Sequence, residues 1–255
     1  MMGTFGEYSK YYNLLYKDKS YENEAKYVHD LIQKHKPHAE KLLELGCGTG
    51  RHALELAKYN YKIKGIDLSA EMLLEADKLL ENSDINGSIR FEKGDVRSFR
   101  CEEKYDACIS LFHVMSYQIT NEDILNSFIT AAHHLEKDGI FVFDCWYGPA
   151  VLTDRPALRV KRLEDSEVQV LRIAEPALYP NDNIVDVNYE IIVRDKCSGK
   201  SNSFGECHRM RYLFLPEIKQ YMALAGLELV DTAEFLSNRE IGFQSWYACF
   251  VGKKK

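Results

Sequence analysis

Several features that would place this chain in a special class are missing from its 255 residues. No apolar run approaches the roughly 20 residues that a helix needs to cross a bilayer, so we expect no membrane partner. The first residues lack a basic segment followed by an apolar stretch, which disfavours a secretory signal. Internal repeats and low-complexity segments are also missing. What remains is the description of an ordinary globular domain.

Paired cysteines are missing too. The chain has seven cysteines, an odd number, and no two of them are spaced as Cys-x-x-Cys. This usage disfavours both a disulfide framework and a zinc site. We therefore expect a reducing, cytoplasmic location and no bound metal.

A clustered basic field is also missing. The formal net charge is -6, whereas nucleic-acid binding needs lysine and arginine gathered along one face. Hydrophobic residues make up 45% and charged residues 28%, which is ordinary for a globular protein. We expect no nucleic-acid partner, and one large domain, or one domain with an insertion, that buries a real core.

The pattern that is present begins with a helical segment over residues 1–40, after which strands and helices alternate up to about residue 145. Such alternation predicts βαβ units and a mainly parallel sheet with both faces covered. The expected strands are 41–45, 63–67, 89–92, 105–111 and 140–144. The expected helices are 51–59, one that follows Ser69 as its N-cap, and 121–135, ended by Gly139.

Residues 150–215 break this rhythm. Val185, Val187 and Ile191 alternate with polar residues, which predicts an antiparallel strand with one solvated face, flanked by strands near 168–173 and 207–215. Pro216 then opens a helix, and strands near 227–230 and 246–251 follow. The predicted fold is α/β, a doubly wound, mainly parallel seven-stranded sheet with an antiparallel β insertion before the last helix and strands. The predicted parts are 1–149, the inserted 150–215 and 216–255.

The most informative stretch is the loop Gly46-Cys47-Gly48-Thr49-Gly50, which follows the first strand. Glycine permits a positive φ and lets a ligand approach the backbone, and ligands of open α/β sheets bind at the carboxyl ends of the strands. The dinucleotide fingerprint needs glycine at the sixth position, where Arg51 stands. The Gly-Lys-Ser/Thr of a phosphate-binding P-loop is also missing. A nicotinamide cofactor is therefore disfavoured.

Four segments in order resemble the motifs of class I S-adenosylmethionine-dependent methyltransferases. They are Glu44-Leu45-Gly46-Cys47-Gly48-Thr49-Gly50, Gly65-Ile66-Asp67-Leu68-Ser69, Gly94-Asp95-Val96 and Ser110-Leu111-Phe112. The resemblance implies that Asp67 accepts hydrogen bonds from the cofactor's ribose, that Asp95 and Val96 contact its adenine, and that Leu111 lies beside the methyl donor. Met72 either packs under the adenine or belongs to the core. The candidate cofactor-binding residues are Tyr11, Glu44, Gly46, Cys47, Gly48, Asp67, Leu68, Met72, Asp95, Val96 and Leu111.

A narrower resemblance joins both ends of the chain. The segment Tyr11-Tyr12-Asn13-Leu14-Leu15-Tyr16 and the later Glu206-Cys207-His208 are similar to the N,N-dimethyltransferases that act on nucleotide-linked amino sugars. That likeness implies that the antiparallel insertion forms part of the acceptor site. The chain departs from the group at residues 113–118 and 209–211, so the acceptor and the attacking atom, nitrogen or oxygen, stay open.

Methyl transfer from a sulfonium needs positioning and a deprotonated acceptor, so the candidate catalytic groups are a base and a tyrosine. His113 follows the fourth strand, close to where the methyl group would lie; the alternative is a polar loop residue. His208, expected to begin a strand of the insertion, either faces the acceptor or lies exposed. Tyr16 either closes over the site or anchors the N-terminal helix.

Four further residues are candidates for contacting the acceptor. Tyr117 and Trp146 follow strand ends on the ligand side and can stack on a ring, as buried aromatic residues often do. Arg209 and Arg211 are predicted to share one face of a strand, where they either clamp a phosphate or lie on a solvated face.

The sequence therefore predicts a methyltransferase that uses S-adenosyl-L-methionine on a small-molecule acceptor, a sugar or a nucleotide-linked amino sugar. One alternative is methylation of an unrelated small metabolite. Another is a non-catalytic module that only binds the cofactor. The oligomeric state, a homodimer included, stays open.

Overall fold

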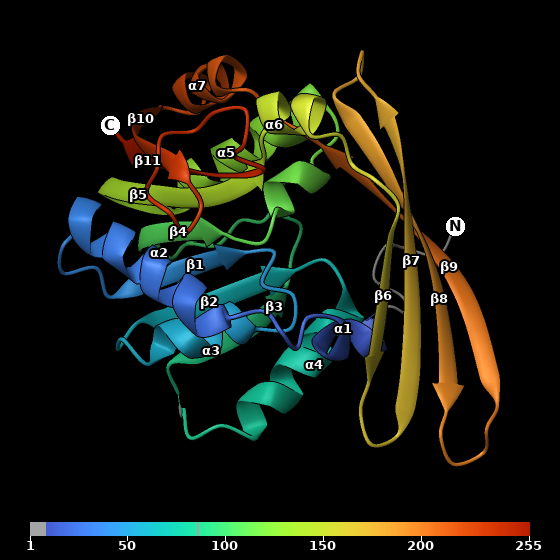
Figure 1. Cartoon of the computed structure of the whole chain (residues 1–255). Coiled ribbons are helices and arrows are strands. Elements are labelled where there is room, and N and C mark those ends of the chain that lie inside the picture. Colours follow the sequence, from blue (N-terminus) through green and yellow to red (C-terminus); the bar gives the residue numbers. More distant parts are fainter. Residues whose placement is uncertain (1–8, 86) are drawn as a thin grey trace.

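The computed structural model describes residues 9–85 and 87–255, in which a seven-stranded sheet lies beside a separate four-stranded sheet (Figure 1). The start of the chain, residues 1–8, lies outside the described residues. The predicted lack of a secretory signal concerns those residues and stays a prediction. The large sheet has the strand order β10-β11-β5-β4-β1-β2-β3. Its strands are β1 (Lys41–Leu45), β2 (Lys62–Asp67), β3 (Ile89–Lys93), β4 (Tyr105–Ser110), β5 (Leu135–Trp146), β10 (Leu227–Glu234) and β11 (Tyr247–Lys254).

The direction of the strands confirms a doubly wound, mainly parallel sheet. Strands β1 to β5 pair in parallel, whereas β11 runs antiparallel to both of its neighbours, β5 and β10. The central strand β1 is buried along Leu42–Leu45, as expected of a parallel strand covered on both faces. The carboxyl ends of the central parallel strands meet at one edge, which is where a ligand is expected.

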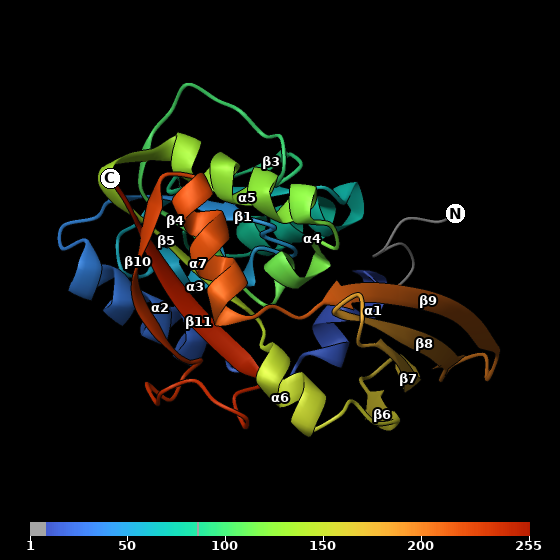
Figure 2. The same cartoon turned by 90° about the horizontal axis from the view of Figure 1, so that it is seen from above.

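Helices cover both faces of the large sheet (Figures 1 and 2). The core against one face includes residues of α2 and α3, and the core against the other includes residues of α5 and α7. Three of the helices begin at hydroxyl N-caps, because the side chains of Ser20, Ser69 and Thr120 each accept a hydrogen bond from a first-turn amide. The helices are α2 (Tyr21–His35), α3 (Arg51–Ala57), α4 (Ala70–Glu81), α5 (Asn121–His134), α6 (Gly148–Thr153) and α7 (Leu215–Leu224).

The four-stranded sheet is antiparallel, with the order β6-β7-β8-β9. Its strands are β6 (Arg159–Glu164), β7 (Val168–Tyr179), β8 (Ile184–Asp195) and β9 (Ser201–Arg211). Val185, Val187 and Ile191 are buried on one face of β8, which confirms the predicted alternation. The short helix α1 (Ser9–Leu15) packs on this sheet, since Leu15 is fully buried against Ile191 and its neighbours. The small sheet is therefore tied to the N-terminal helix as well as to the core.

Several element boundaries differ from the prediction, and those of α5, β5 and β9 are the most informative. Helix α5 ends at His134, and β5 begins directly at Leu135 rather than after Gly139, because Leu135 pairs with Tyr105 of β4. The charged stretch 136–138 carries no strand pattern, so its place in the sheet is decided by that pairing. Strand β9 begins at Ser201, not at 207, and strand β6 and helix α6 were not predicted.

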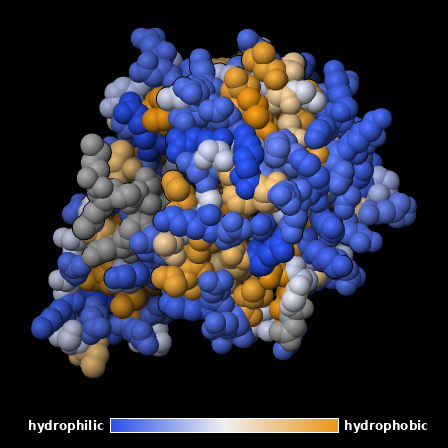
Figure 3. All heavy atoms as spheres, turned by 180° about the vertical axis from the view of Figure 1, so that it is seen from behind, coloured by the Kyte–Doolittle hydropathy of each residue, from blue (hydrophilic) through white to orange (hydrophobic). Residues whose placement is uncertain are grey.

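Seen from behind, hydrophilic residues cover most of the visible surface, and hydrophobic residues show in patches between them (Figure 3). Such scattered patches are normal on a globular domain. Within the described ranges, no helix has both the length and the hydropathy that crossing a membrane requires.

Candidate active site

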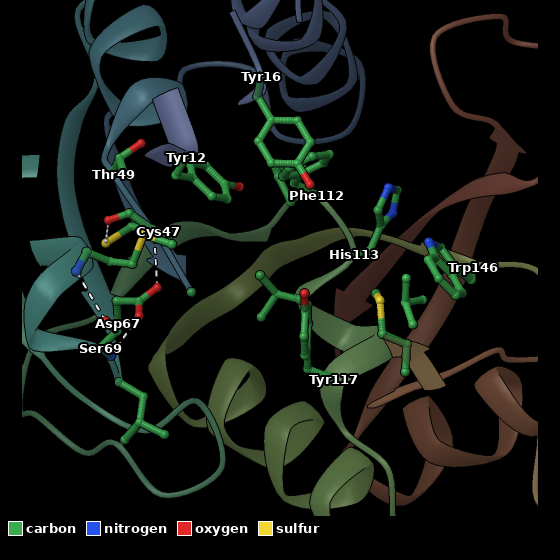
Figure 4. A pocket seen from close by; sticks show the side chains of 18 of the residues that line it. Tyr12, Tyr16, Cys47, Thr49, Asp67, Ser69, Phe112, His113, Tyr117 and Trp146 are labelled. Carbon is green, nitrogen blue, oxygen red and sulfur yellow. Dashed lines mark hydrogen bonds between the residues drawn. The ribbon is translucent and has the colours of Figure 1, made fainter. Parts of the chain in front are cut away.

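A cavity of about 940 Å³ lies between the carboxyl ends of the central strands and the small sheet (Figure 4). Its volume is in the range of sites for drug-sized ligands, roughly 300–1,000 Å³. The residues that the sequence predicted for the site and that line this cavity are Tyr16, Gly46, Cys47, Gly48, Asp67, Leu68, Met72, Asp95, Val96, Leu111, His113, Tyr117 and Trp146. Glu44, Tyr11, His208, Arg209 and Arg211 are not among its lining residues.

The glycine loop forms one wall of the cavity. Gly46 and Gly48 have φ angles of +77° and +53°, which only glycine adopts without strain. The amides of Gly46 and Cys47 both donate to the carbonyl of Ile66, at 2.8 and 2.9 Å, which fastens the loop to β2. A Cβ atom at Gly46 would lie 2.6 Å from Val114, whereas one at Gly48 would meet nothing within 4 Å. The loop is thus packed on one side and open on the other.

Arg51, the residue that breaks the dinucleotide fingerprint, has a structural partner. Its Nε donates to Oδ1 of Asn13 at 2.9 Å, and the hydroxyl of Thr49 donates to the same oxygen at 3.3 Å. These bonds join helix α1 to the end of the glycine loop. The sixth position therefore positions the N-terminal helix over the cavity.

Asp67 ends β2 and faces the glycine loop (Figure 4). One carboxylate oxygen accepts from the amide of Gly48 at 2.8 Å, and the other accepts from the amide of Ser69 at 2.9 Å. Burial raises the pKa of Asp67, and the backbone hydrogen bonds partly oppose that rise. Each oxygen keeps lone pairs that can accept from a vicinal diol, so the residues present fit the ribose of S-adenosylmethionine.

Glu44 lies behind the loop instead of on the cavity surface. Its side chain is 1% exposed, and Oε2 has no hydrogen-bond partner among the described residues. Burial, with the charge of Asp67 as a second cause, raises the pKa of Glu44 to about 8. Its role toward the cofactor stays a prediction.

The far end of the donor side holds the residues predicted for the adenine. Met72 is 2% exposed, yet it also lines the cavity, so it belongs both to the core and to the wall. The Arg97 guanidinium binds the carboxylate of Asp95 and that of Asp123, at 2.6 and 2.9 Å. The hydrogen bond from Arg97 lowers the pKa of Asp95, although partial burial opposes it. Asp95 is thereby fixed beside Val96.

His113 has a partner that the sequence did not indicate, Asp144. The Nδ1 atom of His113 lies 2.6 Å from Oδ2 of Asp144, which is fully buried on β5. The His113 amide also donates to both carboxylate oxygens, each at 3.2 Å. The ring stacks on Tyr247, with the ring centroids 4.4 Å apart. The contact of Nδ1 with Asp144 does not have the geometry of a hydrogen bond, since the buried Nδ1 has no hydrogen-bond partner among the described residues. The negative charge of Asp144 at this distance still favours a proton on Nδ1, which leaves Nε2 to accept one.

The backbone before His113 is unusual. Phe112 and His113 both have positive φ, 62° and 65°, although neither is glycine. Such conformations cost energy and gather at functional sites. They bring the imidazole into the cavity next to Trp146, whose buried Nε1 has no hydrogen-bond partner among the described residues (Figure 4). An unmet indole N–H in this wall is a donor for a polar ligand.

His208 lies within β9, near its end, rather than at the start of a strand. It is 3% exposed and contacts residues of the cavity wall: the Tyr117 hydroxyl is 2.7 Å from Nδ1, and the Tyr189 ring lies edge-on, with the centroids 5.0 Å apart. Its Nε2 is 2.9 Å from Oε1 of Glu206. Tyr117 itself belongs to the short helix η1 (Val114–Tyr117) and points into the cavity (Figure 4).

The tyrosines of α1 and of the turn that follows it separate into two groups. Tyr16 lines the cavity, and its hydroxyl accepts from the guanidinium of Arg172 at 3.4 Å. Tyr11 points elsewhere: its ring stacks on Phe204 of β9 at 6.2 Å. Tyr11 does not line the cavity, because its face of α1 packs on the small sheet, and its contact with the cofactor stays a prediction. Tyr12, which was not predicted, lines the cavity in its place.

Arg209 and Arg211 do not line the cavity, so the predicted alternative of a phosphate clamp finds no support, and Arg209 fits the other alternative, a solvated face. Arg209 pairs with Asp186 at 3.4 Å on the exposed face of the small sheet. Arg211 binds Glu217 of α7 and Asn121 of α5, each at 2.8 Å. The residue between them, Met210, is the one that lines the cavity, because successive side chains of a strand point to opposite faces.

No group of three or more metal-ligating side chains occurs within residues 9–85 and 87–255. All seven cysteines are free thiols. The expectation that the protein works without a metal stays a prediction.

A sheet with one reversed strand, a glycine loop after β1 and a carboxylate at the end of β2 together define a Rossmann-like protein that binds S-adenosylmethionine. Residues 42–139 match a family model described as a methyltransferase domain. The chain is an S-adenosylmethionine-dependent methyltransferase. The predicted class, cofactor and fold are thereby confirmed.

Two curated relatives share this assignment. The dTDP-3-amino-3,4,6-trideoxy-alpha-D-glucopyranose N,N-dimethyltransferase of Streptomyces venezuelae is 32% identical over 58% of this chain and 61% of its own length. The dTDP-3-amino-3,6-dideoxy-alpha-D-glucopyranose N,N-dimethyltransferase of Streptomyces fradiae is 25% identical over 88% of this chain and 85% of its own. Among solved structures, Streptomyces venezuelae DesVI superposes with a TM-score of 0.81 and 25% identity, covering 97% of this chain and 98% of that one.

Proposed function

We propose that this methyltransferase transfers a methyl group to the amino nitrogen of a nucleotide-linked amino sugar. The observation that carries the proposal is the distribution of charge along the cavity. Within the described part of the chain, every carboxylate of the wall, Asp67, Glu71 and Asp95, comes from the donor side. The charged residues that the small sheet contributes to the wall are both cations, Arg159 and Arg172.

On the donor side, the chain holds and orients the cofactor. Asp67 would accept from the ribose hydroxyls, the glycine loop would admit the amino-acid portion, and Met72 and Val96 would flank the adenine. When bound, S-adenosylmethionine supplies an activated methyl group, so the protein mainly positions the acceptor and excludes water.

On the acceptor side, the arginines favour an anionic ligand. The guanidinium of Arg172 lies over the rings of Tyr16 and Tyr189, at 5.8 and 5.1 Å from their centroids. Arg159 lines the same wall from β6. Guanidinium groups bind phosphate oxygens in a bidentate manner, and tyrosines offer stacking faces. A nucleoside diphosphate attached to a sugar has both features.

His113 is the proposed base. An amine attacks only as the neutral form, so a group that takes its proton raises the reactive fraction. The carboxylate of Asp144 beside Nδ1 directs the free lone pair of Nε2 toward the cavity. A hydroxyl acceptor needs more assistance from a base than an amine, because an amine is nucleophilic once it is neutral.

The remaining predictions follow from the same arrangement. We propose that residues 150–215 act as the acceptor half of the site and that 1–149 with 216–255 form the cofactor-binding core. A cytoplasmic location fits seven free thiols. Nucleic acid and membrane are not proposed as partners. A homodimer stays open, since the cavity described here is lined by a single chain.

The first experiment measures S-adenosylhomocysteine binding by calorimetry, and then methyl transfer to a dTDP-linked amino sugar. Two control acceptors are the same amino sugar without the nucleotide and the dTDP-linked sugar with a hydroxyl in place of the amine. We expect turnover with the first acceptor and little with either control. Binding without turnover on any of them would favour a cofactor-binding module instead.

A further inference from the structure

A chain of three polar side chains runs from the small sheet into the cavity wall. Glu206 and His208 lie on β9, and Tyr117 lies on η1 of the core. The distances along the chain are 2.9 Å from Glu206 Oε1 to His208 Nε2 and 2.7 Å from His208 Nδ1 to the Tyr117 hydroxyl. Of the three residues, Tyr117 alone lines the cavity.

The chemistry of these groups gives the contacts a direction. A carboxylate only accepts hydrogen bonds, so the hydrogen of His208 lies on Nε2 and is donated to Glu206. In the neutral imidazole the other nitrogen is then bare and accepts. Burial raises the pKa of Tyr117 well above its usual range, so the phenol keeps its proton and donates it to Nδ1.

We propose that Glu206 and His208 are positioning residues that turn the Tyr117 proton away from the cavity, so that the Tyr117 oxygen accepts an N–H of the acceptor amine. This inference rests on the proposed amine acceptor. An amine held through one N–H has its lone pair oriented, and in this site the orientation is toward the methyl donor. Tyr117 thus selects acceptors that still carry a hydrogen on nitrogen.

The arrangement also links the two sheets. His208 is 3% exposed and packs against Tyr189 of β8, with the ring centroids 5.0 Å apart. Its position therefore depends on the small sheet, whereas the hydroxyl that it orients belongs to the core. The acceptor site is therefore complete only when the small sheet places His208 next to the Tyr117 hydroxyl of the core.

The variants His208→Leu, His208→Asn and Tyr117→Phe test this role. Leucine removes the hydrogen bond and keeps the bulk, whereas the Asn side-chain oxygen can accept at about the place of Nδ1. We expect Tyr117→Phe and His208→Leu each to lower kcat/KM for the amino sugar about 10-fold, roughly one good hydrogen bond. His208→Asn should recover most of the loss, and the double variant should be no worse than either single one.

Cys207→Ser is the matched control, because Cys207 is the exposed neighbour on the opposite face of β9. It should leave kcat/KM unchanged, and all variants should bind S-adenosylhomocysteine as the wild type does. Near-wild-type turnover of His208→Leu would overturn the proposal. So would additive losses in the double variant, or an asparagine variant as poor as the leucine one.

A second measurement does not depend on turnover or on a variant that folds poorly. The ¹⁵N shifts of the His208 ring in the wild-type protein should show hydrogen on Nε2 and a bare Nδ1. The opposite tautomer, or a doubly protonated ring at pH 8, would overturn the inference. A wild type that shows the expected tautomer but methylates no amino sugar would contradict the proposed function instead.

Discussion

The two halves of the cavity are built from different kinds of contact. The donor half depends on backbone: the amides of Gly48 and Ser69 donate to Asp67, and all three residues lie in the β1–α3–β2 unit and the turn that follows it. The acceptor half depends on side chains from segments far apart in the chain, such as Asp144 beside His113 and Arg172 beside Tyr16. Short-range backbone contacts can be recognised as a motif, whereas long-range side-chain contacts cannot.

The comparison predicts that substitutions in one half reduce cofactor binding and substitutions in the other reduce use of the acceptor. Asp67→Ala should show the largest effect. Losing a charged acceptor of two ribose hydroxyls costs two charge-assisted hydrogen bonds, so the Kd of S-adenosylhomocysteine should rise roughly several hundred-fold. Calorimetry measures it, and Asp77→Ala on the exposed side of α4 is the control. Unchanged affinity would contradict the assigned donor site.

His113→Ala should separate chemistry from cofactor binding. We expect kcat to fall on the order of 100-fold, the lower end of general base catalysis, with the affinity for S-adenosylhomocysteine nearly unchanged. Steady-state kinetics at several pH values measures it, and Asp144→Asn should show a smaller loss in the same direction. A variant with wild-type turnover would remove His113 from the role of base.

Arg172→Ala tests the acceptor half alone. Loss of a guanidinium contact to phosphate should raise the KM of a nucleotide-linked acceptor about 10-fold, while the KM of the sugar without nucleotide stays the same. Arg162→Ala is the matched control, because Arg162 lies on the exposed face of β6. Equal effects on both acceptors would show that Arg172 supports the tyrosine cluster and does not contact phosphate.

Ile191→Ala tests whether the packing of the small sheet on α1 can be weakened without loss of cofactor binding. The side chain is fully buried between the small sheet and α1, so its truncation should lower the free energy of unfolding by about 2–4 kcal/mol. The KM of the acceptor should rise by a small factor, with cofactor binding retained. Thermal melting with and without S-adenosylhomocysteine measures both, and a parallel loss of cofactor affinity would argue against separate halves.

The last effect is a dependence of stability on pH and concerns Glu44, whose pKa is raised to about 8 in the fold from an ordinary 4.5. Between these values the folded protein holds a proton that the unfolded chain has released, so stability falls as the pH rises. Glu44→Gln removes this slope, about 1.4 kcal/mol per pH unit at most. The difference in unfolding free energy between variant and wild type, followed by denaturant titration from pH 5 to 8, should therefore change steadily. A constant difference would mean that Glu44 titrates normally.

Much of the fold was predictable because period-two and period-3.6 patterns report burial. The strands of the parallel sheet, the alternation in β8 and the hydroxyl N-caps follow from residues near in sequence. The start of β5 at Leu135 was not predictable, since a charged stretch joins the sheet only through its partner β4. Strand β6 was missed for the same reason, because one of its residues alone, Leu163, is buried.

In the candidate site, too, residues near one another in the sequence were predicted and long-range contacts were not. Glycine spacing and the acid after the second strand located the donor end from the sequence. Asp144 carried no signal beyond its place at the end of an apolar strand. The arginines predicted to contact the acceptor lie on a different strand from the arginines that line the cavity. Arg209 and Arg211 were chosen for their spacing, but Arg159 and Arg172 are the ones that reach the cavity.

The sequence by itself therefore determined the class of protein: a loop of alternate glycines, a carboxylate at the next strand end and a βαβ rhythm are local, and local backbone geometry follows local sequence. The tertiary structure alone decided which charges face the acceptor, that Asp144 stands behind His113, and that His208 reaches Tyr117 from another sheet. The contact between His208 and Tyr117 joins residues 91 positions apart, and the packing of the two sheets brings their side chains within a hydrogen bond.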